Sequence, residues 1–508
     1  MSLYLSPESA IICCGDRYDG ILYMEIIGRK QEIKELNELY NSEKAEFVVI
    51  YGRRRVGKTF LVDESLEGKI TFRHAGLSPV ETESKKDKED KQKVNVLKMQ
   101  LKHFYLSLLK HGMKKSHQPK SWLEAFYMLS ELLESLDDGK RQVVFLDELP
   151  WMDTPRSFFV TAFEGFWNTW GCHRKNLMLV VCGSAASWML DNFFDNHGGL
   201  YGRTTHEIHL HPFSLKECEE FYKGRGVKWS RYDIAQSYMV MGGIPYYMNY
   251  VQKGMSLDEA VNSLFFEQRA RLDGEYDRLF ASIFSKPEEM KSIIEAMSRR
   301  HSGWTRKELI DMTGMPKNGA FSKMVKSLVA SDFATKYVPF EGGDEHYKLS
   351  DPFCWFWLHF VKGKKRLYAD FWKGDASQTV VSWRGIAFEE LCWCHWREIK
   401  RALGIEGVVT EMSAWTRRGD DQTDGLQIDL LLKRNDHIVN MCEMKFYNEE
   451  FSVDKSYHKT LVHRENLLQK KLPKRMVVHS TLVTTEGLRY NEYSGIFQKV
   501  VTLDDLFE

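Results

Sequence analysis

The chain has 508 residues, enough for about three or four domains of ordinary size. Its 71 basic and 71 acidic side chains balance to a net charge of zero, which excludes a global positive field for nucleic acid, so any such contact needs a local patch. No apolar run reaches the roughly 18 residues of a membrane-spanning helix, and nine scattered cysteines favour a reducing, cytoplasmic setting.

The first 25 residues are expected to form a leader ahead of the first domain. Residues 1–23 lack the basic start and the long apolar centre of a secretory signal. Met24 lies just before the first recognisable motif, so the leader is either a flexible arm or a misassigned start. The first folded domain is therefore expected over residues 26–214.

A phosphate-binding loop is predicted early in that domain. The apolar run 47–50 predicts a buried strand, and soon after it the chain reads Gly52, Arg53, Arg54, Arg55, Val56, Gly57, Lys58 and Thr59. The glycines let successive backbone N–H groups point at a phosphate, at the positive end of the next helix. Lys58 can then reach the β- and γ-phosphate oxygens, and Thr59 can ligate Mg²⁺. The order strand, loop, helix predicts that the chain binds a nucleoside triphosphate.

A second apolar run supplies acidic partners for this loop. Residues 143–146 are Val, Val, Phe and Leu, and Asp147 and Glu148 follow directly. Ligands lie at the carboxyl ends of parallel strands, so we expect Asp147 to hold Mg²⁺ through water. Glu148 is expected to orient or deprotonate the attacking water. The alternative is an ordinary strand that runs into an acidic loop, and the nearby phosphate-binding loop argues against it.

The end of this domain contains weaker signals. Ser184 follows a predicted strand, either as a sensor of the γ-phosphate or as the cap of the next helix. Arg203 is either a γ-phosphate contact, in its own chain or across a subunit interface, or an ordinary surface arginine. His209 and His211 share one strand face. Metal binding there is conceivable, but a plain sheet strand is favoured because no carboxylate or cysteine cluster accompanies them.

Residues 215–285 read as a helical lid. The lid is interrupted by Gly242, Gly243 and the apolar run 244–247. This turn is either a hinge that packs the lid onto the nucleotide site or a tight connection between two helices.

Residues 286–378 have the pattern of a winged helix followed by a linker. Helices are predicted over 287–297, from the cap Thr305, and over 319–330, with strands at 333–338 and 346–349. Lys317, Lys323 and Lys326 lie at the start of or along the third helix, where they suit phosphate contacts. A winged helix that packs within its own chain is the alternative.

The C-terminal domain, expected over residues 379–508, offers a second acidic site. Folding the predicted hairpin 427–445 about Asp436 places Asp429 opposite Glu443, with Cβ atoms about 5 Å apart. Lys445 lies on the same strand face as Glu443. Two carboxylates this close repel unless a cation such as Mg²⁺ lies between them, and the lysine can orient or activate water that attacks a phosphodiester. A hairpin with a solvated salt bridge is the alternative.

Two further observations lie on the helix predicted upstream of the hairpin. Glu389 could supply a third carboxylate to the acidic site. The run Cys392, Trp393, Cys394, His395 includes two metal-binding residue types, but it follows helical spacing, so a helix face is favoured over a zinc site.

Together these motifs resemble a known family. The motifs at 27–32, 52–59, 145–148, 183–184 and 242–245 look like those of the archaeal-type P-loop ATPases of the STAND/AAA-like group. Those at 385–389, 427–429 and 442–445 resemble the restriction-endonuclease-like, PD-(D/E)XK, domain often fused to them. The polar stretch 417–424 departs from that pattern.

The resemblance implies an α/β fold with a P-loop core, a helical lid, a winged helix and an α/β nuclease-like domain. It implies ATP and Mg²⁺ as cofactors, with Lys58, Thr59, Asp147 and Glu148 at the ATP site. Asp429, Glu443 and Lys445 match the nuclease core, and Glu389 is a looser fit.

Two functions remain open. In the first, the nucleotide state gates Mg²⁺-dependent cleavage of DNA. In the second, ATP hydrolysis changes an assembly state, and the C-terminal domain binds nucleic acid or protein without cleaving it; the neutral chain and the arginine-free third helix favour this reading. ATP, DNA and further copies of the chain, assembled through the ATPase core, are the expected partners, and no membrane is expected.

Overall fold

The computed structural model describes residues 27–78, 96–194, 200–363, 372, 378–417 and 426–508. They divide into two compact units. The N-terminal unit contains residues 27–211 and 277–288, and the C-terminal unit contains residues 212–276 and 289–508. The predicted leader, residues 1–25, lies outside the described residues.

A parallel five-stranded sheet forms the centre of the N-terminal unit, with strand order β2-β3-β4-β1-β5. The middle strands are buried along almost their whole length, as expected for a parallel sheet covered on both faces. The strands are β1 (Glu46–Tyr51), β2 (Ile70–Ala75), β3 (Gln142–Asp147), β4 (Leu177–Gly183) and β5 (His206–His209). The predicted final strand is present as β5, but it ends at His209, so the expectation that His211 shares its strand face is wrong.

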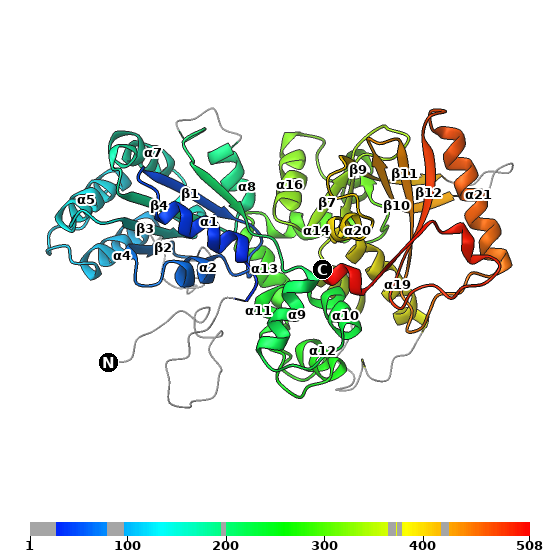
Figure 1. Ribbon diagram of the computed structural model, residues 1–508. Coiled ribbons are helices and arrows are strands. Elements are labelled where there is room, and N and C mark those ends of the chain that lie inside the picture. The colour runs from blue at the N-terminus through cyan, green and yellow to red at the C-terminus, as the bar shows by residue number, and fades with distance from the viewer. Residues whose placement is uncertain (1–26, 79–95, 195–199, 364–371, 373–377, 418–425) are drawn as a thin grey trace. The chain divides into compact units, whose positions relative to one another are not determined.

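Helices α4, α5 and α7 cover one face of this sheet (Figure 1). Alternate strand residues such as Phe47, Val49 and Val144 point into a shared apolar core with the three helices, following the two-residue period of a strand. The helical segments of this unit are α1 (Lys30–Tyr40), α2 (Lys58–Ser65), α4 (Val96–Lys110), α5 (Trp122–Ser135), α6 (Leu149–Met152), α7 (Phe159–Thr169), η1 (Gly171–His173), α8 (Ala186–Met189) and η2 (Leu190–Phe194).

The C-terminal unit begins with helices that start at strong caps. Ser214, Ser230 and Ser256 each form a capping box at the start of α9 (Leu215–Gly224), α10 (Arg231–Met241) and α12 (Leu257–Phe265). Gly243 has a φ of 61°, and a Cβ there would lie 2.3 Å from the carbonyl oxygen of Phe213. Residues 242–244 therefore make a tight connection from α10 into α11 (Pro245–Met248), which contains the rest of the apolar run.

The helices and strands predicted over residues 287–349 are present. The predicted third helix is α16 (Gly319–Ala330), and Thr305 caps the second helix in a capping box with Glu308. A three-stranded sheet of order β6-β8-β7 completes this segment, with β6 between the first and second helices and β7 and β8 after the third. The segments are α14 (Pro287–Met297), β6 (Trp304–Thr305), α15 (Arg306–Thr313), β7 (Ala334–Tyr337) and β8 (His346–Leu349), and α13 (Glu275–Ile283) precedes them.

The structure contains support both for phosphate contacts by this segment and for packing of the segment within its own chain. Phe340, in the loop after β7, donates its N–H to the carbonyl oxygen of Ala414 at 3.0 Å and packs on Trp415, which is packing within the chain. Meanwhile Lys317, Lys323 and Lys326 are exposed.

A mixed five-stranded sheet of order β13-β12-β11-β10-β9 closes the C-terminal unit. Strands β9, β10 and β11 are antiparallel, while β11, β12 and β13 are parallel, with α21 as the crossover from β11 to β12 (Figure 1). The segments are α17 (Pro352–Phe356), η3 (Trp357–Val361), α19 (Gln378–Cys394), α20 (Trp396–Ala402), β9 (Thr410–Arg417), β10 (Leu426–Arg434), β11 (Ile438–Lys445), α21 (Lys455–Lys471), β12 (Val477–Thr484), η4 (Ser494–Ile496), β13 (Lys499–Thr502) and η5 (Asp504–Phe507).

The run Cys392–His395 belongs to a helix and its C-terminal end, as predicted. Helix α19 packs against β11 and contains both cysteines. His395 Nε2 accepts a hydrogen bond from the Leu215 N–H at 3.1 Å, and its Nδ1 lies 2.9 Å from the Leu391 carbonyl oxygen. Backbone groups of the protein therefore occupy both ring nitrogens.

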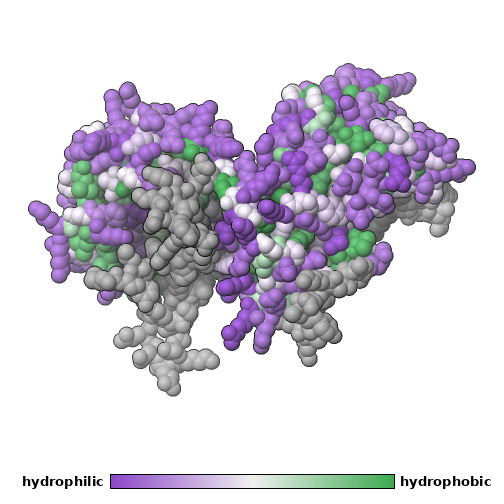
Figure 2. All heavy atoms as spheres, turned by 60° about the horizontal axis from the view of Figure 1, so that its bottom comes forward, coloured by the Kyte–Doolittle hydropathy of each residue, from purple (hydrophilic) through white to green (hydrophobic). Residues whose placement is uncertain are grey.

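Hydrophilic side chains cover most of the described surface on the face drawn in Figure 2, and apolar side chains appear there in separate patches. Among the described helices, none combines the length and the apolar character that crossing a membrane would need.

Candidate functional site

The loop from Gly52 to Thr59 joins β1 to α2 in a strained backbone conformation. Gly52 has a φ of 142°, Gly57 a φ of 94°, and Arg55, which carries a side chain, a φ of 75°. A Cβ at Gly52 would lie 2.3 Å from the carbonyl oxygen of Leu210, so only glycine fits there. Such positive-φ positions turn backbone N–H groups inward, which makes a concave cradle for an anion at the start of α2.

Lys58 is buried within this loop and points back across it. Its Nζ donates to the carbonyl oxygens of Gly52 and Arg53 and to the Ser184 hydroxyl, each at 3.0 Å. A phosphate oxygen can replace these acceptors, because all of them are neutral.

Thr59 and Asp147 meet at the carboxyl end of the sheet. The Thr59 hydroxyl donates to Asp147 Oδ2 at 2.8 Å, and the Cys182 thiol contacts the other oxygen of the same carboxylate. A hydroxyl and a carboxylate are oxygen donors of the kind that Mg²⁺ prefers beside phosphates. The donor set therefore fits a nucleotide with its magnesium ion.

Glu148 lies beside this pair in a left-handed backbone conformation, with a φ of 46°. Its carboxylate accepts the Ser184 N–H at 3.0 Å and the Ser184 hydroxyl at 2.5 Å. Burial raises the pKa of Glu148, and the charge of Asp147 adds to the rise, while Lys58 opposes it. An acid with a raised pKa can take a proton from water more readily than an ordinary carboxylate.

Ser184 connects the two halves of this site. It accepts from Lys58 and donates to Glu148, and the N-cap of α8 is Ala185. The side chain thus faces the loop rather than capping the helix, which favours the sensor reading over the capping one.

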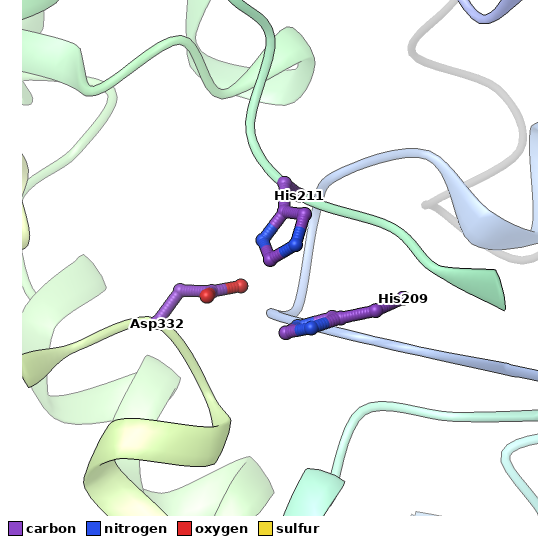
Figure 3. Close-up of side chains that lie close together, drawn as sticks. All are labelled: His209, His211 and Asp332. Carbon is purple, nitrogen blue, oxygen red and sulfur yellow. The ribbon is translucent and has the colours of Figure 1, made fainter. Parts of the chain in front are cut away.

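The remaining residues predicted for this site lie at its edges or beyond. Arg54 stacks its guanidinium on the ring of Trp151 at 5.4 Å. Arg203 is exposed in the turn before β5. The rings of His209 and His211 lie 3.8 Å apart at the end of β5 (Figure 3). Figure 3 also draws Asp332, a residue of the other unit, and we assign no metal site to the two histidines.

Comparison with known proteins agrees with this geometry. Residues 26–251 match the family described as "ATPase domain predominantly from Archaea". An uncharacterized ATP-binding protein of Methanocaldococcus jannaschii is 46% identical over 43 residues, which are 8% of this chain and 73% of that protein. The chain belongs to the archaeal-type ATPases. It is thus an ATP-binding P-loop ATPase, and members of this family use ATP with Mg²⁺.

A second relative of this archaeal-type ATPase extends over most of its length. An uncharacterized protein of the same archaeon is 23% identical over 453 residues, 87% of this chain and 92% of that protein. Among solved structures, the Walker-type ATPase of Pyrococcus abyssi (18% identity, TM-score 0.43, 66% of this chain and 96% of that one) shows a distant likeness. So does the ORC2 protein of Aeropyrum pernix (14%, 0.42, 71% and 93%). At these scores the two structures carry no functional weight.

The second candidate site of this ATPase lies where α19 meets β10. His301, in the turn before β6, points its Nε2 at Glu389 Oε2, 3.0 Å away, and at Asp429 Oδ1, 3.3 Å away. Gln427 also donates to Asp429 Oδ1, at 2.6 Å. Burial lowers the pKa of His301, but its hydrogen bonds and charge interactions with Asp429 and Glu389 outweigh this and raise the pKa to about 10.

The pKa values of the two carboxylates in this cluster shift in opposite directions. Burial raises the pKa of Glu389, and the charge of Asp429 adds to the rise. The pKa of Asp429 is lowered, since the hydrogen bonds from His301 and Gln427 outweigh the burial that would raise it. Trp393 Nε1 donates to the Asp429 carbonyl oxygen at 2.8 Å, which fixes α19 against β10 at this point.

The second pair of predicted residues forms its own cluster. Glu443 lies 2.9 Å from Lys445 Nζ and 2.9 Å from an Arg464 nitrogen, and it also accepts from the Tyr457 hydroxyl. Burial lowers the pKa of Lys445, but the Glu443 charge outweighs this, so the pKa is raised overall. Lys445 therefore carries a positive charge at neutral pH.

The predicted pairing of the hairpin is confirmed along its ladder, where Leu430 pairs with Cys442 and Lys433 with Val439. Asp429 and Glu443 lie one position beyond the last pair, so their own pairing stays a prediction. The hydrogen bonds and ion pairs nevertheless bring Asp429 together with Glu389 and His301, and Glu443 together with Lys445 and Arg464.

Sequence reasoning missed His301, Gln427, Tyr457 and Arg464. Gln427 shares a strand face with Asp429 and could have been found from the alternation. Tyr457 and Arg464 are two helical turns apart on α21, so their common face was also readable. His301 has no local signal, because it comes from a turn 128 residues before Asp429.

Proposed function

We propose that the nucleotide state of the ATPase domain gates a metal-dependent DNA-cleaving site in the C-terminal unit. The observation that carries the proposal is the set of charged side chains at the junction of α19, β10 and β11. Glu389 and Asp429 meet there, and Glu443 and Lys445 occupy the adjoining strand. Acidic groups and a lysine on neighbouring strands of a mixed sheet suit phosphodiester hydrolysis.

At the ATP site the proposed roles follow the contacts. The backbone of residues 52–57 holds the phosphates, Lys58 neutralises their charge, and Thr59 and Asp147 hold Mg²⁺. Glu148 orients the attacking water, and Ser184 senses the γ-phosphate through the hydrogen bonds that it makes to Lys58 and Glu148. Arg203 is proposed as a contact to the γ-phosphate from its own chain or from a neighbouring copy.

At the C-terminal site a divalent ion would be held by Asp429 with Glu389 and Glu443. A bound ion supplies charge stabilisation to a phosphoryl group and lowers the pKa of its water. Lys445 orients water toward the phosphate, since its ammonium is fixed by Glu443 and lies over the Tyr457 ring at 5.0 Å. Arg464 holds the Glu443 carboxylate in place on its other oxygen.

A plasmid assay tests the proposal. The full chain is incubated with supercoiled DNA, Mg²⁺ or Mn²⁺, and ATP, and nicked and linear products are measured. We expect cleavage that needs both metal and nucleotide and that Asp429→Asn abolishes. Asp436→Asn is the matched control, because this carboxylate lies on the same hairpin but is held by Arg434 in its turn. Cleavage that survives Asp429→Asn, or none in the wild type with either metal, contradicts the assignment.

A second function is favoured by the way the charges are paired. Glu443 already contacts two cations, and His301 lies between Glu389 and Asp429. A site with its charges satisfied in this way can serve as a binding surface without cleavage. ATP-dependent DNA binding in a gel-shift assay, with intact plasmid in the same samples, would identify such a switch.

A further inference from the structure

His301 reaches the candidate nuclease site from outside the domain predicted to form that site. The turn that holds it is well fixed. Arg300 Nε donates to the Gly303 carbonyl oxygen at 2.7 Å, its guanidinium lies 3.7 Å from the Trp304 ring centre, and the Tyr337 hydroxyl donates to the Ser302 carbonyl oxygen. The fold of this turn therefore holds the His301 imidazole in position.

We propose that His301, Glu389 and Asp429 together bind one divalent first-row transition-metal ion, with His301 as the nitrogen ligand. The inference rests on the proposed function, because it concerns the metal of the same site. It adds a ligand from the predicted winged helix and names the class of ion.

The spacing of the three side chains suits one ion. Metal–ligand bonds of about 2.1 Å place neighbouring ligand atoms about 3.0 Å apart in an octahedral site and about 3.4 Å apart in a tetrahedral one. His301 Nε2 lies 3.0 Å from Glu389 Oε2 and 3.3 Å from Asp429 Oδ1. The three ligand atoms lie within 4.8 Å of one another, so one ion can reach them all.

A buried carboxylate oxygen gives a second, independent indication. Glu389 Oε2 is buried, and among the described residues no donor makes a hydrogen bond of good geometry to it. Its ion-pair partner is His301 Nε2, 3.0 Å away. A metal ion held between the two side chains would give this buried oxygen a direct bond.

The ligand types point to the class of ion. Mg²⁺ prefers oxygen ligands and its own water, whereas imidazole suits the transition metals. One imidazole and two carboxylates therefore favour an ion such as Mn²⁺ over Mg²⁺. Bound metal would also join the turn at 300–303 to α19 and β10, so that the predicted winged helix and the acidic site share one ion.

The test follows Mn²⁺ binding to the full chain, stripped of metal with a chelator and kept free of nucleotide. Free Mn²⁺ is measured by electron paramagnetic resonance, and pulsed spectra report nitrogen bound to the ion. We expect a site that Asp429→Asn removes, with an imidazole nitrogen signal in the wild type. His301→Gln should lose that signal and weaken Mn²⁺ binding by about tenfold or more, as removal of metal-supporting groups does elsewhere.

The matched control is His346→Gln, which removes an imidazole of β8 that contacts the Asp344 carbonyl oxygen and should leave both readouts unchanged. If Asp429→Asn removes the site but His301→Gln alters neither the signal nor the affinity, the inference fails while the proposed function stands. Tighter Mn²⁺ binding by His301→Gln would also overturn it, since the imidazole would then compete with the ion. If the wild type has no Mn²⁺ site that is lost in Asp429→Asn, the metal site of the proposed function is contradicted as well.

Discussion

Lys58, Ser184 and Glu148 form a chain of hydrogen bonds across the nucleotide site. The Ser184 hydroxyl accepts from Lys58 and donates to Glu148, so the serine orients the acid as long as the lysine faces it. A γ-phosphate that attracts Lys58 would break the first bond and leave Ser184 free to reorient. The position of the acid thus depends on whether a phosphate is bound.

Glu148→Gln should separate ATP binding from hydrolysis. The amide cannot take a proton from water, so we expect the hydrolysis rate to fall by about 10²–10⁴-fold, while ATP affinity persists because Lys58 and the loop are unchanged. Since burial disfavours the charge of Glu148, the neutral variant should also unfold at a higher temperature. Phosphate release, binding of a fluorescent ATP analogue and thermal unfolding check these points. Lys58→Ala, the contrasting control, should lose binding itself, and hydrolysis at the wild-type rate in Glu148→Gln would contradict the role.

At this scale the sequence indicated the loop and the acidic strand end of the proposed ATP site, and it indicated part of the second cluster. Residues 52–59, 147 and 148 carry their chemistry in short motifs, whose spacing already implies the local backbone. The acidic site is assembled by strand pairing and by a distant turn. Alternation placed Lys445 on the same strand face as Glu443. It could not show that Arg464 also pairs with Glu443, because the packing of a helix on a sheet has no signature in one strand.

Among the elements, the edge strand β2 and helix α4 bring together two histidines, the buried His74 and the half-buried His103. His74 is 2% exposed, packs on Phe104 and contacts the Ser107 hydroxyl at 2.9 Å. Burial lowers its pKa well below the ordinary value, and the neighbouring His103 and His111 add to this. Burial likewise lowers the pKa of His103. The core at this edge of the sheet therefore holds its imidazoles neutral.

This arrangement predicts acid sensitivity of the N-terminal unit. Below about pH 6.5 the unfolded chain gains a proton at His74, and the folded chain does not until its lower pKa is reached, so stability falls as the pH falls. His74→Phe should remove part of that loss and can still pack on Phe104. Hydrogen exchange of β2 and α4 amides at about pH 7.5 and about pH 5.5 measures it. Equal pH dependence in wild type and variant would refute the assignment.

The junction of β8 and α19 depends on a buried ion pair. Lys348 and Glu390 lie 2.7 Å apart with side chains 4% and 7% exposed, and the lysine also lies 3.9 Å from the Trp393 ring centre. Lys348→Met would leave the Glu390 charge buried without its partner, so we expect a loss of about 3–5 kcal/mol in unfolding free energy.

Chemical denaturation measures this loss. The control is Lys336→Met, which breaks an exposed pair with Glu345 and should cost no more than about 1 kcal/mol. Equal losses in the two variants would show that burial does not set the cost. The ion pair could not be predicted from the sequence. A lysine in a strand gives no sign that its partner lies on a helix later in the chain.

For the whole molecule, zero net charge means that DNA contact must be local. The exposed Lys317 and Lys323 of the predicted winged helix are the proposed contacts. Replacing both with Ala should weaken DNA binding equally across sequences and reduce the slope of log affinity against log salt by about two. Fluorescence anisotropy at several salt concentrations checks this, with Lys44→Ala, an exposed lysine of the other unit, as the control. An unchanged slope would assign the segment to packing within the chain.

The tight approach of Gly52 to Leu210 has a mechanical consequence. Arg29 Nη2 donates to the carbonyl oxygens of Val56 and His211, at 3.3 and 2.6 Å, so the phosphate loop is tied twice to the last residues before the chain leaves the N-terminal unit at position 212. If the loop moves when a nucleotide binds, residues 210 and 211 would move with it. Transmission of the nucleotide state would then start at a covalent connection and would need no long relay of side chains.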